Sequence, residues 1–282
     1  MSLHTSMPTL VVVPRRPYWV WAFAVASIAV VIGMVVTFAT TPNISWPVVG
    51  QYLFSPLILS GLGTTVLLSV TSMAVGIVLG VAVGLMRMSG NRILSTIALI
   101  YTTVLRGIPA LLLLLLWGNI AILVKSVTLG IPFTDAIFVT FQTNDLITPF
   151  IAAVIAFSLS EAAYLGEIVR SGLLSVDRGQ VEAAGALGMS PARTMRRIVM
   201  PQALRVIIPP VGNNFVTLIK GTSLVSVLAG GDVLTQAQNI AATSYRIMEM
   251  LIVATVWYLV LVGIASIGQM FLERAVSKGA VR

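Results

Sequence analysis

The sequence contains no cysteine and a single histidine, His4, near its N-terminus. The absence of cysteine excludes disulfide bonds, thiolate catalysis and cysteine-ligated metals, and one histidine cannot supply a His pair or an HExxH zinc site. No GxxxxGK[ST] nucleotide-binding loop is present either. We therefore expect no metal site, no catalytic residues and no cofactor bound by this chain.

Charged residues are also scarce, at 9% of the chain, whereas 57% of the residues are hydrophobic. Soluble domains carry about a quarter charged residues, so this composition predicts an integral membrane protein. The apolar runs reach the roughly 20 residues that a helix needs to cross a bilayer, and they lack the strict alternation of a β-barrel. The sequence predicts an all-α protein with six spans, near 18–40, 59–86, 96–124, 148–170, 206–230 and 250–272.

The distribution of arginine and lysine predicts the orientation, because short loops rich in these residues stay in the cytoplasm. Segments 41–58, 125–147 and 231–249 carry only two basic residues, and most of the others flank the opposite ends of the spans. Both termini are then cytoplasmic, with tails at 1–17 and 276–282. The net charge of +8 is explained by this rule and by anionic lipid, so we expect no nucleic-acid partner.

A polar segment of about twenty residues separates the fourth and fifth spans. Asp177 can cap a helix that ends at Gly188, a residue suited to a left-handed turn. Ser190 can cap a second helix, with Pro191 in its first position, and this helix is expected to end at Pro201. The second helix carries one basic stripe, formed by Arg193, Arg196 and Arg197.

The spacing of residues in this polar segment resembles the cytoplasmic EAA signature of ABC importer permeases. The signature reads EAA, three residues, Gly, nine residues, Ile, any residue, Leu, Pro, and the sequence departs from it only where Met200 replaces Leu. The matching positions are Glu182, Ala183, Ala184, Gly188, Ile198 and Pro201.

The resemblance extends over about residues 55–275. Within the family, this sequence is most similar to the polar amino acid uptake branch. Its other pieces are Gly61, Thr64 and Thr65, LRGIP at 105–109, AYLGEIVRSG at 163–172, and PPVGNNF with KGTSLVSV between 209 and 227. The resemblance implies the type I importer permease (MetI-like) fold in a bacterial inner membrane. It also implies an extra N-terminal transmembrane helix at 18–40 and a cytoplasmic coupling loop at 171–205.

The family resemblance also implies partners. Two ABC ATPase subunits would bind ATP and Mg and hydrolyse the ATP, an extracytoplasmic amino-acid-binding protein would deliver the substrate, and a second permease copy or a paralogue would complete the pathway within the lipid. The short EAA helix would seat in a groove on the ATPase. The residues expected to couple the two are Gly179, Glu182, Ala183, Ala184, Gly188, Ile198 and Pro201.

Polar residues inside the predicted spans are the candidates for substrate binding, because an ionisable group at membrane depth usually faces a cavity or a partner. Arg106 suits a substrate carboxylate, and Glu161 or Glu167 suits an ammonium group. Pro209, Pro210 and Gly212 favour a break in the fifth span that would bring donors to the pathway. The full set is Arg106, Ser160, Glu161, Tyr164, Glu167, Asn214, Lys220, Thr222 and Ser223.

Three alternatives stay open. Glu167 can pair with Arg170 three residues later, and Lys220 can brace helix ends, so the buried charges can be scaffold and not site. The cargo can be an amino-acid-like metabolite, such as an opine or another zwitterion. A passive channel could use the same charges, but a channel has no reason to carry the EAA corner.

Overall fold

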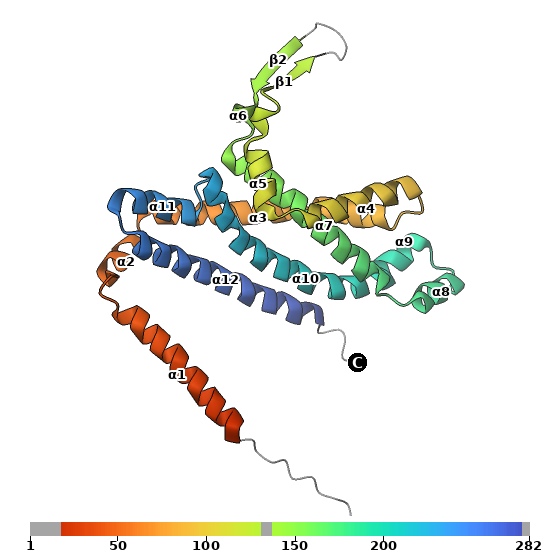
Figure 1. Cartoon of the computed structure of the whole chain (residues 1–282). Coiled ribbons are helices and arrows are strands. Elements are labelled where there is room, and N and C mark those ends of the chain that lie inside the picture. The colour runs from red at the N-terminus through yellow and green to blue at the C-terminus, as the bar shows by residue number, and fades with distance from the viewer. Residues whose placement is uncertain (1–17, 131–136, 278–282) are drawn as a thin grey trace, which may run out of the picture. The chain divides into compact units, whose positions relative to one another are not determined.

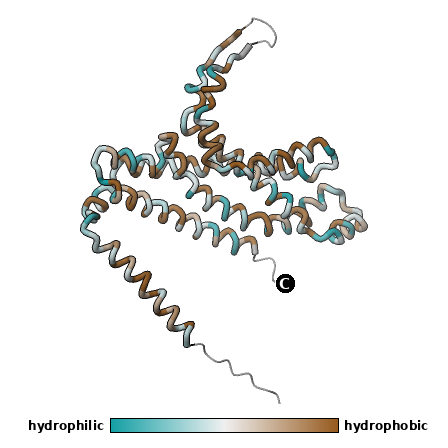
Figure 2. The backbone as a smooth tube through the Cα atoms, in the orientation of Figure 1, coloured by the Kyte–Doolittle hydropathy of each residue, from teal (hydrophilic) through white to brown (hydrophobic). Residues whose placement is uncertain are grey.

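The computed structural model describes residues 18–130 and 137–277 (Figure 1), and these form two compact units. The first unit ends at Ser45 and contains α1 (Tyr18–Thr40), a helix of 23 residues with no buried residue. Most residues of α1 are apolar, and much of its tube is brown in Figure 2. A helix that is apolar on all sides is typical of a membrane span.

The second unit begins at Trp46 and holds the remaining helices together with a short hairpin. Its elements are α2 (Trp46–Leu53), α3 (Pro56–Arg87), α4 (Arg92–Gly107), α5 (Ala110–Gly118), the 3₁₀ turn η1 (Ile120–Ile122), β1 (Ser126–Gly130), β2 (Ile137–Gln142), α6 (Thr143–Leu146), α7 (Pro149–Leu174), α8 (Arg178–Ala186), α9 (Pro191–Thr194), the π-turn η2 (Met195–Val199), α10 (Met200–Gly221), the 3₁₀ segment η3 (Thr222–Leu228), α11 (Val233–Ser244) and α12 (Ile247–Ser277).

Four helices in the described residues, α1, α3, α7 and α12, are long and apolar enough to cross a membrane individually. Two bent pairs raise the count to six, the number expected, if each pair forms one span. One pair is α4 with α5, bent by 99°, so the prediction of a single span over 96–124 is wrong in detail. The bend falls at Ile108, whose backbone is extended before Pro109, because proline disfavours helical geometry in the residue before it.

The other bent pair is the α9–η3 path with α11, and its bend lies farther along the chain than the break predicted at Pro209, Pro210 and Gly212. α10 continues through Pro209 and Pro210, and the chain turns only beyond η3, where Ala229 and Gly231 adopt positive φ angles of 52° and 81°. Two prolines remove two backbone donors, but packing supports the helix here. A Cβ at Gly212 would lie 2.8 Å from the Gln269 side chain, so α12 contacts α10 directly at this level.

The second helix of the polar segment does not end at Pro201, contrary to the expectation. α9 leads through the π-turn η2 directly into α10, where Pro201 occupies the second position. Proline fits there because the first helical residues have no intrahelical partner for their N–H groups. The helical path is therefore continuous from Pro191 to Gly221.

The segment 125–147 contains an antiparallel hairpin that the all-α expectation did not include. β1 pairs with β2 from Ser126 opposite Gln142 to Gly130 opposite Ile137, with an irregularity between Leu129 and Gly130. All six residues of β2 are exposed.

The core of the second unit centres on a close seam between α3 and α7. Gly76, Gly80 and Gly84 recur every fourth residue of α3, and a Cβ at Gly80 would lie 2.6 Å from the Leu165 Cβ. The Ser158 hydroxyl of α7 also donates to a backbone carbonyl of α3, 3.2 Å away. The two helices are thus packed backbone to backbone. This packing fixes α7 against α3.

Candidate functional site

A polar hollow lies between α3, α4 and α7, with a volume of about 480 Å³. We call it the arginine hollow, and its lining comprises Arg87, Leu99, Thr102, Thr103, Arg106, Gly107, Tyr164 and Glu167. Three of the sequence candidates, Arg106, Tyr164 and Glu167, therefore meet in one place. α4 is held against α7 by the Tyr101 hydroxyl, which donates to the Leu159 carbonyl over 2.8 Å.

Arg106 occupies the hollow as a cation stacked on an aromatic ring. Its guanidinium carbon lies 5.3 Å from the centre of the Tyr164 ring, within the range of a cation–π interaction. Arg106 belongs to the last turn of α4, just before the bend at Ile108, and it is exposed. The stacking orients the guanidinium and leaves its N–H groups available to a ligand.

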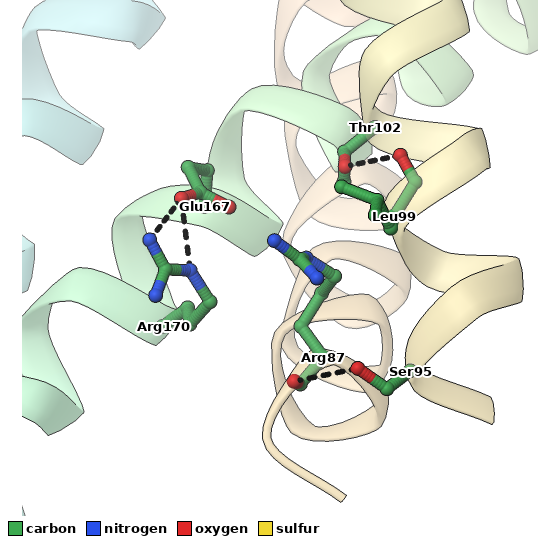
Figure 3. A network of polar contacts seen from close by, with 6 residues as sticks. All are labelled: Arg87, Ser95, Leu99, Thr102, Glu167 and Arg170. Carbon is green, nitrogen blue, oxygen red and sulfur yellow. Dashed lines mark hydrogen bonds and ion pairs between the residues drawn. The ribbon is translucent and has the colours of Figure 1, made fainter. Parts of the chain in front are cut away.

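An ammonium-binding role would require a free Glu167 carboxylate, but this carboxylate is paired. The carboxylate accepts two hydrogen bonds from Arg170, one of them 2.8 Å long from Nε, so the pairing considered as the alternative is present. Figure 3 shows this pair on α7, with Arg87 extending from the end of α3 into the space between Glu167 and Thr102. The Arg87 Nε is buried and has no hydrogen-bond partner among the described residues.

Glu161 faces a different surface of α7, toward α3 and α10. A Cβ added at Gly76 of α3 would lie 2.9 Å from the Glu161 Cβ. The Asn214 side chain of α10 contacts the Glu161 carboxylate. The Oε2 atom of Glu161 is buried without a hydrogen-bond partner in the described part of the chain. The neighbouring Ser160 is buried as well. Glu161 and Asn214 thus form a second polar position, separate from the arginine hollow.

Lys220, Thr222 and Ser223 are removed from both places. Thr222 donates to the Ile219 carbonyl at 2.7 Å and Ser223 to the Lys220 carbonyl at 2.8 Å, so both hydroxyls satisfy the end of their own helix. Lys220 and Ser223 line a mostly apolar hollow of about 300 Å³ beside α11 and α12. The nine sequence candidates therefore fall into three groups and not one site.

A buried polar network at the start of α11 was not predicted from the sequence. Asp232 is fully buried; its Oδ2 accepts from the Leu234 N–H and the Tyr258 hydroxyl, both at 3.0 Å, and its Oδ1 accepts from the Thr235 N–H at 3.4 Å and from the Thr235 hydroxyl. The available signal was an aspartate three residues before a threonine at a helix start, the pattern of an N-cap.

The same network explains two residues of the second span. The Thr65 hydroxyl accepts from the Val233 N–H at 3.1 Å, and a Cβ at Gly61 would lie 3.0 Å from the Asp232 carbonyl oxygen. Gly61 and Thr65 thereby let the start of α11 lie against α3. Their role in this structure is to fix that junction.

The polar corner around α8 has part of the predicted capping. The Asp177 Oδ1 accepts from the Gly179 N–H at 2.6 Å, and Gly188 ends the turn with a φ of 73°. Ser190 occupies the N-cap position of α9, but its side chain makes no capping hydrogen bond there. The corner is thus built from one side-chain cap and one left-handed glycine.

The expected coupling residues divide between the inside and the outside of this corner. Ala184 is buried against the chain itself, and Ile198 is partly buried. Gly179, Glu182, Ala183 and Pro201 are exposed, and Leu187 is 83% exposed. The outward surface of α8 is therefore a small, mixed polar and apolar surface.

These features define a class of protein: a multi-pass membrane protein with polar positions between its helices and a projecting helical corner. Residues 76–278 match the family described as binding-protein-dependent transport system inner membrane component. The chain belongs to this family.

Curated relatives cover most of the chain. It is 37% identical to the arginine transport system permease protein ArgU of Corynebacterium glutamicum over 95% of this chain and 84% of that protein. It is 34% identical to the glutamine transport system permease protein GlnP of Escherichia coli K12, over 81% of this chain and 94% of that protein.

Solved structures show the same fold. A crystal structure of an amino acid ABC transporter with histidines is 33% identical, with a TM-score of 0.68, covering 80% of this chain and 97% of that one. An inward-facing structure of the MetNI methionine ABC transporter has a TM-score of 0.62 at 20% identity, covering 79% and 97%. The chain therefore has the type I ABC importer permease fold that the sequence predicted.

Proposed function

We propose that this chain is the membrane-spanning permease subunit of an ATP-driven importer for polar amino acids. The observation that carries the proposal is the projecting α8 corner. Its cap at Asp177, its left-handed turn at Gly188 and its exposed outward surface form a helix available for docking, at the end of a continuous helical path into the bundle. The relatives are permeases of transport systems for arginine and glutamine, which supports amino acids as the cargo.

The α8 corner would dock on an ABC ATPase subunit, two of which would serve a permease pair. Glu182 offers a carboxylate to a basic residue of the partner, Ala183 permits close approach, and Leu187 offers an apolar contact. ATP and Mg would bind to that ATPase and not to this chain. The corner and both chain termini would lie in the cytoplasm, as the distribution of basic residues predicts.

Two polar positions beside α7 would bind the substrate, one its ammonium group and the other its carboxylate. Glu161, with its unpaired Oε2, and Asn214 would bind the ammonium group, and the Arg106 guanidinium stacked on Tyr164 would bind the carboxylate. An unpaired buried carboxylate is costly within a membrane protein and is retained where a cation visits it. Glu167 would serve this arrangement indirectly, through its pairing with Arg170.

The test is reconstitution of the permease with its ATPase and its extracytoplasmic binding protein in proteoliposomes. We expect one or a few polar amino acids to bind the binding protein, to stimulate ATP hydrolysis and to accumulate inside. Accumulation of an opine or another zwitterion in their place would redirect the substrate assignment. Uptake that proceeds without ATP would instead favour a passive channel and refute the importer.

A further inference from the structure

The arginine hollow carries more positive charge than the chain itself neutralises. Arg87 and Arg106 line it, Arg170 lies beside it, and Glu167 supplies the one carboxylate among its lining residues. Three guanidinium groups against one carboxylate leave a formal charge of about +2 at this position. Such an excess attracts an anion, because a carboxylate or phosphate group would offset it.

Glu167 cannot provide that compensation, because it is already engaged. Its carboxylate accepts both hydrogen bonds from Arg170. Its interactions with Arg87 and Arg106 are electrostatic and act at longer range. Within the described residues, neither Arg87 nor Arg106 forms an ion pair within 4.0 Å of a carboxylate oxygen. Two guanidinium groups therefore face the hollow with hydrogen-bonding capacity unused.

The two cations come from separate elements. Arg87 is the last residue of α3, and its backbone carbonyl accepts from the Ser95 hydroxyl at 3.3 Å, which ties it to the start of α4 (Figure 3). Arg106 is fixed by its stacking on Tyr164. The exposed Thr103 adds a hydroxyl to the lining of the hollow.

We propose that the arginine hollow is an oxyanion site, in which Arg87 and Arg106 together bind one carboxylate or phosphate group. The planar guanidinium presents its N–H donors in a fork that matches these oxygens, and the buried Nε of Arg87 is a donor that such a ligand would satisfy. Arg87 thus joins the binding residues, a role that its position beside a basic loop does not suggest from the sequence.

The group can come from two sources. One is the carboxylate of the transported amino acid, an assignment that rests on the proposed function; the other is the phosphate of an anionic phospholipid headgroup. Wild-type uptake is measured first, so that a failure of the importer proposal is recognised separately. The lipid measurement requires no transport.

The experiment compares Arg87→Gln and Arg106→Gln with Arg92→Gln, an exposed arginine at the start of α4 that does not line the hollow. For the phosphate, each protein is extracted from vesicles of phosphatidylcholine and phosphatidylglycerol in fixed ratio, and retained phosphatidylglycerol is counted by native mass spectrometry. For the carboxylate, the initial rate of uptake is measured at saturating binding protein.

A phosphate ligand predicts that both hollow variants lose retained phosphatidylglycerol while the control keeps it. A carboxylate ligand predicts that lipid retention is unchanged and that uptake falls about tenfold in both variants. The proposal is overturned if both variants match Arg92→Gln in both measurements. Should Arg87→Gln fail to insert, Arg106→Gln alone decides the outcome against the same control.

Discussion

The glycine seam between α3 and α7 allows a prediction with a control on the same helix. At Gly84, an added Cβ would lie 2.8 Å from the Gly166 carbonyl oxygen and 2.9 Å from a Val169 methyl group. The carbonyl is backbone and cannot rotate away, so α7 itself must move. At Gly63, also in α3, an added Cβ would meet nothing within 4 Å.

The two substitutions to alanine should have opposite effects on stability. Alanine is favoured over glycine in a helix by about 1 kcal/mol, so Gly63→Ala should stabilise the protein by up to that amount. Gly84→Ala has the same propensity gain but costs about 1–3 kcal/mol in overpacking against α7. The difference between the two variants is then about 2 kcal/mol, with Gly84→Ala the less stable.

Thermal unfolding of both variants in the same detergent measures this difference. For a chain of this size about 1 kcal/mol corresponds to a change of roughly 2–4 °C in midpoint, so the two variants should differ by about 4–8 °C. The wild-type midpoint should fall between them. Equal midpoints for Gly63→Ala and Gly84→Ala would refute the backbone-to-backbone packing of α3 on α7.

Three further predictions concern the polar positions. Glu161→Gln removes a carboxylate whose buried Oε2 has no hydrogen-bond partner in the described part of the chain, so the thermal midpoint should hold or rise while uptake falls about tenfold; uptake equal to wild type would remove this residue from the pathway. Gly188→Asp places a side chain at a φ of 73°, which costs about 1–2 kcal/mol locally, and it should insert normally yet hydrolyse ATP without transport; normal uptake in proteoliposomes would contradict the coupling assignment. Asp232→Ala removes the N-cap of α11 and the carboxylate that accepts from the Tyr258 hydroxyl. It should lower the free energy of unfolding by about 2–4 kcal/mol, against about 1 kcal/mol for the exposed cap variant Asp177→Ala. Equal losses for the two variants would argue against the buried network.

Local signals predicted local structure well. Gly188 was expected to be left-handed and Asp177 to cap a helix, and both hold, because a cap depends on a few neighbouring residues whose preferences the sequence displays directly. The membrane class and the family fold follow from composition and motif spacing in the same way. These features need no knowledge of which helix packs on which.

The predictions that failed depended on tertiary packing. The sequence cannot show that α10 passes through Pro209 and Pro210, because the contact between Gly212 and Gln269 that supports it joins residues 57 positions apart. The candidate site divides for the same reason. Glu161 and Tyr164 are three residues apart on α7, yet they contact different helices. Glu161 packs against Gly76 of α3 and contacts Asn214 of α10, whereas Tyr164 contacts Arg106 of α4.

The unbroken helical path from α9 into α10 turns the α8 corner into the short arm of a lever. Val199, Ala203 and Ile207 pack on Val169 and Leu173 of α7, which gives the rod a buried pivot close to its corner end. From Ala203 to Gly221 the long arm measures about 27 Å at 1.5 Å per residue. A tilt of about 10° at the corner would therefore displace the far end by roughly 5 Å, about one turn of helix.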